Sequence, residues 1–461
     1  MRDTMDTTAH GPTSHRTIDL GAIDPARSRH GGRRSALVLT DDAVVVGTAD
    51  GGVHAYDRPT LDEQWRADGT TARDDEREPG AIVSATAFEG GVAVGERGVD
   101  GEIRLQDGTT GAPRWRYRTT ADVGDPEKET RFFLPFVVDL VSENDRLYAA
   151  ARRYERGGSG SANTSSDNSG DDSGSGGGSS SGGSSGDSGG SNRSFESCVY
   201  AFATDGTVEW TYRTDASPIA LDVRGDRVAV AFNRCPGGHQ EGLIVLDADT
   251  GTELASWDPL TEGTADTANG DRRIGDLSLF DTGLACTSHA DYRGYRLDAD
   301  YEPLWAAKLA TEAQVGDERL YAYPNHCHAT DQGTVFITGN TYVRESRETE
   351  SRHPAEHTIF GYTPDGERRW SADVGGFVTE IGTDGDRLVA PCGQNFRTRD
   401  PTSHGLRVFD VREGPRTTLA TDGIVTAGTI DERTVAAIEE PVIYHDEGTE
   451  QGAYRLHVGS V

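Results

Sequence analysis

The chain has 461 residues, of which 34% are apolar and 58 are glycine, a composition that suits many short strands and tight turns. Its 77 acidic and 45 basic side chains give a formal net charge of −32. This charge disfavours nucleic acid and anionic membrane surfaces as partners, because both bind clustered positive charge.

The first elements in the chain resemble one another in spacing. We expect residues 1–15 to form a disordered N-terminal tail, followed by a strand over residues 16–20. Alternating apolar runs near residues 36–39, 43–46 and 53–56 predict three strands, and a fourth strand that contains Trp65 follows a turn over residues 56–60. Four short antiparallel strands within about fifty residues are typical of one blade of a β-propeller.

The tryptophans indicate that this unit repeats along the chain. They recur at intervals of roughly fifty residues once one long insertion is subtracted, and each follows a turn rich in Asp and Gly, such as Asp247–Gly251. Leu419 stands at the same position of the seventh unit. The repeat position is occupied in the other units by Trp65, Trp115, Trp210, Trp257, Trp305 and Trp370.

The insertion covers residues 157–193 and consists almost wholly of Gly, Ser, Asp and Asn. Such a segment cannot bury enough apolar surface to offset its ordering entropy, so we expect a disordered loop within the third blade. A linker between two domains is the alternative. The repeat register continues on both sides of the segment, which favours a loop.

The repeat predicts an all-β fold, an eight-bladed β-propeller of four-stranded antiparallel blades, with residues 16–461 as a single domain. The chain ends soon after the third strand of the last blade, near residues 454–458, so that blade lacks an outer strand of its own. We therefore expect the N-terminal strand to complete it. Closure of this kind would remove an open sheet edge.

The run Leu246–Trp257 resembles the repeat of pyrroloquinoline-quinone-like propellers, in which an Asp-x-x-Thr-Gly turn leads to a strand ending in Trp. The same repeat builds quinoprotein dehydrogenases and BamB-like outer-membrane assembly proteins. The resemblance spans nearly the whole chain and implies that the tryptophans form a structural girdle between blades rather than a ligand platform.

The resemblance leaves two functions open. One is a non-catalytic binding or assembly scaffold with a protein partner and no cofactor. The alternative is a ligand- or metal-binding propeller with a site at the axial mouth, of which a quinoprotein-like oxidoreductase would be one form. The resemblance implies that a quinoprotein would need a calcium ion held by carboxylates and amides, a catalytic Asp and often a disulfide between adjacent cysteines. No adjacent cysteines occur in the chain, so we favour the scaffold.

Loops between the second and third strands are uneven in length, and we expect them on one rim of the ring. They are short in the first, second and fifth blades, and binding residues concentrate on the loops of rigid scaffolds. We therefore expect partner contacts on this rim, with neutral drift as the alternative. The long loops cover residues 152–197, 233–241, 340–357, 393–404 and 439–452.

Cysteine and histidine residues gather on the same rim and are the candidate ligands of a transition metal such as zinc. In a strand, His326 and His328 point to one side and Cys327 to the other, and the spacings match no zinc motif closely. Simple burial of the cysteines is the alternative. The candidate metal ligands are His326, His328, Cys327, Cys235, His239 and Cys392.

Arginine clusters in blades three and six could bind carboxylate or phosphate groups. We favour the interpretation that they lie in solvated loops balanced by Glu345, Glu348 and Glu350, because nearly every basic residue of this chain is arginine. These arginines are Arg152, Arg153 and Arg156 and Arg344, Arg347 and Arg352.

The remaining expectations concern location. No apolar run reaches the roughly 18 residues of a membrane span, and the N-terminus shows no export signal. Five widely spaced cysteines fit a reducing compartment. The acidic surface with only Lys128 and Lys308 as lysines resembles that of haloarchaeal cytoplasmic proteins. We expect a cytoplasmic, monomeric protein.

Overall fold

The computed structural model describes residues 15–27, 33–69, 79–156, 193–260, 270–346, 349–393, 398–444 and 448–461. The expected tail over residues 1–15 and the expected loop over 157–193 lie outside the described residues, apart from His15, which begins β1, and Arg193, which begins β12. The described helical segments are α1 (Thr120–Val123) and a single turn at Pro401–Ser403. The all-β prediction is confirmed.

The first half of the chain forms antiparallel sheets of consecutive strands. The unit β6–β9 and the unit β10–β13 are joined into one eight-stranded sheet by the single pair Phe136 and Arg97. The strands are β2 (Ala36–Leu39), β3 (Ala43–Gly47), β4 (Val53–Asp57) and β5 (Glu63–Ala67); β6 (Ala81–Phe88), β7 (Gly91–Arg97), β8 (Glu102–Asp107) and β9 (Pro113–Arg118); β10 (Phe136–Glu143), β11 (Arg146–Arg156), β12 (Arg193–Phe202) and β13 (Val208–Thr214); and β14 (Ser217–Arg224), β15 (Arg227–Arg234), β16 (Leu243–Asp247) and β17 (Glu253–Trp257).

The second half repeats this arrangement, with one added strand. The three-residue β22 pairs with the N-terminal end of β23 and widens that sheet to five strands. The strands are β18 (Ile274–Phe280), β19 (Gly283–Ser288), β20 (Arg293–Leu297) and β21 (Pro303–Lys308); β22 (Ala313–Val315), β23 (Glu318–Thr330), β24 (Gly333–Val343), β25 (Thr358–Tyr362) and β26 (Arg368–Asp373); β27 (Gly382–Asp384), β28 (Arg387–Cys392), β29 (Gly405–Asp410) and β30 (Gly414–Leu419); and β31 (Ile424–Asp431), β32 (Thr434–Glu440) and β33 (Tyr454–Ser460).

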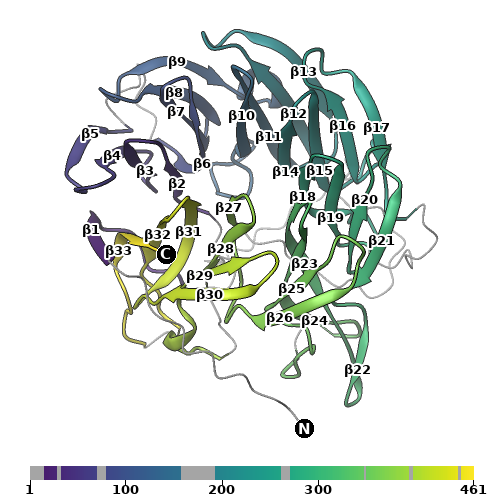
Figure 1. The fold of residues 1–461 in the computed structure, drawn as a ribbon. Coiled ribbons are helices and arrows are strands. Elements are labelled where there is room, and N and C mark those ends of the chain that lie inside the picture. The colour runs from purple at the N-terminus through teal and green to yellow at the C-terminus, as the bar shows by residue number, and fades with distance from the viewer. Residues whose placement is uncertain are drawn as a thin grey trace, which may run out of the picture.

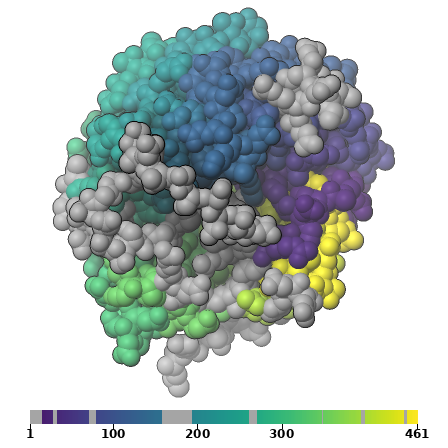
Figure 2. All heavy atoms as spheres, turned by 180° about the vertical axis from the view of Figure 1, so that it is seen from behind, coloured from purple at the N-terminus to yellow at the C-terminus, as the bar shows by residue number. Residues whose placement is uncertain are grey.

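The sheets stand side by side around a central axis, as Figure 1 shows. The two ends of the described chain meet in one sheet of order β1-β33-β32-β31, in which β1 (His15–Gly21) is antiparallel to β33. Ile18 and Leu20 of β1 pack against a buried cluster that includes Leu456 and Val458. Figure 2 shows the same neighbourhood from behind, with N-terminal residues in purple beside C-terminal ones in yellow.

Tryptophans of the outer strands contact the turn of the following sheet. The indole Nε1 of Trp210 on β13 donates a hydrogen bond of 2.9 Å to the Ala248 carbonyl oxygen, in the turn between β16 and β17. Gly251 of that turn has a φ of +66°, and a β-carbon there would lie 2.6 Å from the Trp210 ring. The same indole-to-carbonyl bond joins Trp65 to Gly108, Trp115 to Thr204, Trp305 to Pro364 and Trp370 to Val411.

Three aspartates tie neighbouring innermost strands together. Asp139 on β10 accepts a hydrogen bond from the backbone N–H of Leu221 on β14. Asp222 accepts one from Leu279 on β18, and Asp276 accepts one from Cys327 on β23. Because their side-chain oxygens accept from backbone N–H groups of the next sheet, these aspartates are structural links.

Candidate functional site

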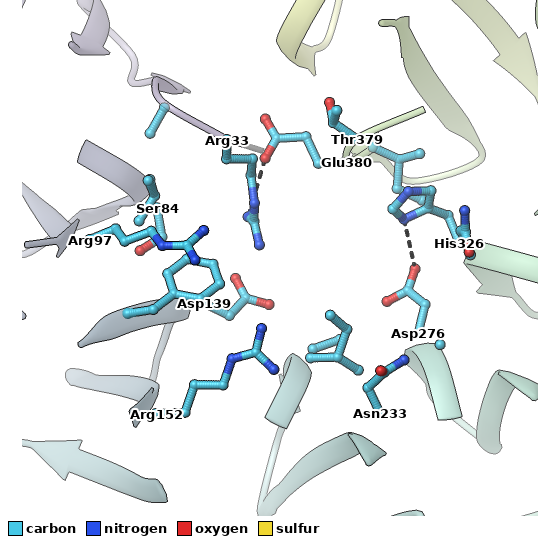
Figure 3. A pocket seen from close by; sticks show the side chains of 18 of the residues that line it. Arg33, Ser84, Arg97, Asp139, Arg152, Asn233, Asp276, His326, Thr379 and Glu380 are labelled. Carbon is cyan, nitrogen blue, oxygen red and sulfur yellow. Dashed lines mark hydrogen bonds and ion pairs between the residues drawn. The ribbon is translucent and has the colours of Figure 1, made fainter. Parts of the chain in front are cut away.

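One pocket lies on the axis of the ring and has a volume of about 470 Å³. Its wall takes residues from the innermost strand of every sheet, so it is the central funnel of the fold. Figure 3 shows its charged and polar side chains from close by. The innermost-strand residues on the wall include Leu37, Ala85, Asp139, Ala220, Asp276, His326, Gly382 and Gly428.

One side of the funnel is an arginine wall, formed by Arg33, Arg97 and Arg152. Their guanidinium carbons lie 5.9, 4.9 and 5.4 Å from the centre of the Phe136 ring. The three come from separate elements, namely the segment before β2, the end of β7 and the middle of β11, and all point into the pocket in Figure 3. A ring face stabilises nearby cations, so Phe136 holds the three groups together.

The arginine wall has few compensating carboxylates. Nε of Arg97 donates to the Arg131 carbonyl oxygen at 2.9 Å, and no carboxylate of the described chain acts on Arg97. Arg152 donates to the Ser217 hydroxyl. Within the described ranges, Arg33 is the one member of the wall in an ion pair, at 3.3 Å from Glu380.

Burial and mutual repulsion change the electrostatics of these groups. Burial lowers the pKa of Arg97 well below its usual value, and the guanidinium groups around it lower it further. Burial also lowers the pKa of Arg152 to about 10, with a contribution from Arg33. Each charged guanidinium would be more stable with an anion nearby.

The opposite side of the funnel offers hydrogen-bonding groups of both kinds. Nδ1 of His326 lies 3.5 Å from the Asp276 carboxylate, and its Nε2 is 3.0 Å from the Val378 carbonyl oxygen. The amides of Asn233 and Asn325 also line this side. Among the pocket carboxylates, burial raises the pKa of Glu380, and it raises that of Asp139 to about 6.

An aromatic ledge, formed by Phe132, Phe133, Tyr154 and Phe195, lies at the edge of the arginine wall. The Tyr154 ring centre is 4.3 Å from Phe132, 5.3 Å from Phe133 and 5.6 Å from Phe195. Phe132 is 38% exposed and is one of three large apolar side chains exposed in the described chain. The ledge therefore places apolar surface beside cationic surface.

The six residues predicted as metal ligands form no metal-binding group. Among the described residues, no three or more His, Cys, Asp and Glu side chains are arranged to hold an ion. His326 and His328 bond to the carbonyls of Val378 and Gly385 of the next sheet, while Cys327 is buried against the Ala285 carbonyl.

The other predicted ligands are engaged locally. The Cys235 thiol donates to the Glu241 carbonyl, and the His239 ring packs on Phe232 at 4.6 Å. Burial raises the pKa of Cys235 to about 12 and that of Cys392 to about 11. Thiolates are the form that binds metal, so this burial disfavours coordination by either residue.

The predicted arginine loops behave differently from the expectation. Arg152 lies on the funnel instead of in a charge-balanced loop, while Arg153 pairs with Glu155. In the sixth unit Arg344 pairs with Glu312 at 3.2 Å, and Glu345 pairs with Arg319. Arg347 and Glu348 lie outside the described residues.

Sequence reasoning missed Arg33 and Arg97, although the repeat carried a signal for Arg97. One repeat position lies at the end of the second strand, opposite the first residue of the innermost strand. Arginine occupies it in three blades, as Arg97 opposite Ala81, Arg152 opposite Phe136 and Arg234 opposite Ser217. Aligning the blades on this position would have marked all three as funnel residues. Arg33 lies in the segment between β1 and β2 and has no counterpart in the repeat.

Comparison with known families matches residues 27–184 to the family described as outer membrane protein assembly factor BamB. Among solved structures, BamB from Moraxella catarrhalis is 12% identical, covers 97% of this chain and 98% of its own, and has a TM-score of 0.48. A quinohemoprotein alcohol dehydrogenase from Pseudomonas putida HK5 is 10% identical, with 96% and 75% covered and a TM-score of 0.53. A quinohemoprotein alcohol dehydrogenase from Comamonas testosteroni is also 10% identical, with 96% and 76% covered and a TM-score of 0.52.

No curated protein matches the chain. The identities to the solved structures are low enough that these likenesses concern the fold, and together with the family match they support a PQQ-like propeller. No helix in the described ranges is long and apolar enough to cross a membrane.

Proposed function

We propose that this protein is a non-catalytic binding scaffold that holds a protein partner on the face around the funnel mouth. The observation that carries the proposal is the aromatic ledge beside the arginine wall. Arg, Tyr and other aromatic side chains dominate the energetics of protein interfaces, and here they gather on one face of a strongly acidic chain.

Long strands on the same face support the proposal. β11 and β12 have 11 and 10 residues, and β23 and β24 have 13 and 11, against four or five in β2–β5. Both pairs contribute to the funnel through Arg152, Phe195 and His326. The added length lies where the second strand of each blade ends, at the pairs Arg156 with Arg193 and Leu320 with Val343. This is the side of the loops between second and third strands, where we expect the contacts.

Affinity capture in high salt would test this role. Wild-type protein is compared as bait with Phe132→Ser and with Leu304→Ser, which removes a 57% exposed leucine from the outer strand β21. We expect at least one protein to be retained by wild type and Leu304→Ser but lost with Phe132→Ser. Identical sets of retained proteins for all three baits would contradict the proposal.

We also propose that the scaffold is an eight-bladed propeller closed by its N-terminal strand, as the repeat predicts. The register of β1 on β33, from His15 opposite Gly459 to Gly21 opposite Tyr454, supports closure. The acidic surface supports a haloarchaeal, cytoplasmic and monomeric protein, since net negative charge favours solubility in strong salt.

The proposed role needs no metal or quinone cofactor. A calcium-dependent quinone site of the kind implied by the resemblance requires a group of carboxylate and amide ligands. Asp139 and Asp276 already accept hydrogen bonds from backbone N–H groups of the next strand, and all five cysteines are free. The pocket residues thus do not fit the metal part of such a site, and we derive no redox step.

A further inference from the structure

The funnel contains an unexplained excess of positive charge. Arg33, Arg131 and Arg152 lie within electrostatic range of Arg97, because each of them lowers the pKa of Arg97. Among the described residues, Glu380 is the only carboxylate in an ion pair with any of the three arginines of the wall. The chain as a whole has a net charge of −32, so a cluster of positive charge in the funnel is opposite in sign to the rest of the protein.

Such a cluster is costly unless something neutralises it. Buried or partly buried charges are normally paired, and unpaired ones destabilise the fold. Asp139 lies among the arginines in Figure 3 and interacts with Arg33, while its carboxylate also accepts from the N–H groups of Leu140 and Leu221. Asp139 and Glu380 carry at most two negative charges beside the three arginines of the wall, so positive charge remains for a counter-anion to neutralise.

We propose that the arginine wall binds a small organic anion with at least two negative charges, of the phosphate monoester or di- and tricarboxylate class. Guanidinium groups bind the oxygens of both kinds of anion through paired hydrogen bonds. The terminal N–H groups of Arg97 donate to no group in the described chain, since its one hydrogen bond uses Nε. Arg97 is thus the main candidate to contact the anion.

The rest of the funnel sets the size and polarity of the ligand. A cavity of about 470 Å³ falls in the range of small-molecule sites and exceeds what one inorganic phosphate would fill. The opposite wall presents the side-chain amides of Asn233 and Asn325. These groups would bind hydroxyl or amide groups, so the ligand has a polar organic body.

Thermal unfolding and calorimetric titration test the site with citrate, glucose 6-phosphate, inorganic phosphate and the monoanion acetate, in about 0.5 M KCl to limit non-specific attraction. We expect citrate or glucose 6-phosphate to raise the unfolding temperature and to bind more tightly than phosphate, and acetate to have no effect. An unchanged unfolding temperature with citrate, glucose 6-phosphate and phosphate alike would overturn the proposal. Binding of phosphate as tight as that of both organic anions would overturn its organic part.

Two variants separate binding from folding. Arg97→Gln and Arg152→Gln are each expected to weaken anion binding about ten- to hundredfold, and to unfold at or above the wild-type temperature without anion because repulsion is relieved. Arg66→Gln removes an exposed arginine paired with Glu63 and should bind as wild type does. Unchanged affinity in Arg97→Gln and Arg152→Gln would overturn the proposal. The partner proposal is independent, because it is tested at Phe132 by capture.

Discussion

The contact between Gly251 and Trp210 offers a direct test of how neighbouring sheets are held together. Gly251 has a φ of +66°, and a β-carbon there would lie 2.6 Å from two atoms of the Trp210 ring. Gly225 is a matched control, because its φ is +64° and no atom lies within 4 Å of the corresponding position. Alanine at both sites therefore carries the same backbone strain, and only one substitution also collides with a side chain.

The expected magnitudes follow from these two contributions. A left-handed backbone costs an alanine about 1 kcal/mol after the gain from a less flexible unfolded chain. Overpacking adds about 1–3 kcal/mol, because the Trp210 ring is 8% exposed and its indole is bound to Ala248. We expect a loss in unfolding free energy of about 1 kcal/mol for Gly225→Ala and about 2–4 kcal/mol for Gly251→Ala.

Urea unfolding followed by far-UV circular dichroism at fixed KCl measures both losses. A Trp210→Leu background provides a second test, since leucine already stands at this position as Leu419 of β30. Without the ring, the cost of Gly251→Ala should fall to that of Gly225→Ala. Equal losses for the two alanine variants in the wild-type background, or an undiminished loss in Trp210→Leu, would refute the contact as the cause.

Four further outcomes are expected. Burial raises the pKa of Asp222 to about 7. The folded state therefore keeps the carboxyl proton at pH values where the unfolded state releases it, and the free energy of unfolding falls as the pH rises from about 4 to about 7. Asp222→Asn should flatten that fall in urea titrations, and an unchanged pH dependence would contradict the assignment. Deletion of residues 1–21 should lower the unfolding temperature, because it exposes the edge of β33. A peptide spanning β1 should restore the unfolding temperature, and a scrambled version of that peptide should not. Equal stability without β1 would argue against closure. The unfolding temperature should rise from about 0.1 to 1 M KCl as self-repulsion is screened, and a flat or falling curve would count against a haloarchaeal origin. Protein purified in about 1 M KCl without chelator should carry less than about a tenth of an equivalent of transition metal, whereas a stoichiometric metal lost on His326→Ala would reinstate the predicted site.

The repeat made the fold predictable because each blade repeats the same local pattern. Alternating apolar strands, Asp-initiated turns and one tryptophan per unit are local features, and the Asp247 side chain caps its turn by accepting from the N–H of Thr250, at 2.8 Å. The pairing of β1 with β33 was also within reach, because a blade lacking an outer strand points to the other end of the chain.

The site was less predictable because it depends on which residues converge at the axis. The Cys and His residues suggested a metal, yet strand alternation buries Cys327 on the side away from His326 and His328. The arginine wall combines a repeat position, at Arg97 and Arg152, with Arg33 from a segment outside the repeat. A count of surface cations could not separate Arg152 from Arg153, although one faces the funnel and the other pairs with Glu155.

A positive funnel within a strongly negative chain has a consequence for how an anion would be selected. At low salt the net charge of −32 repels anions at distances beyond the funnel, which slows their entry. At about 1 M salt the Debye length is about 3 Å, so the surface charge no longer acts at the mouth and only direct contacts with Arg97 and Arg152 attract the ligand. Chloride then competes for the same guanidinium groups, and a multiply charged ligand that contacts both arginines at once retains an advantage over it. Strong salt would therefore remove the long-range repulsion, which acts most on polyvalent anions, and leave chloride as their competitor at the two arginines.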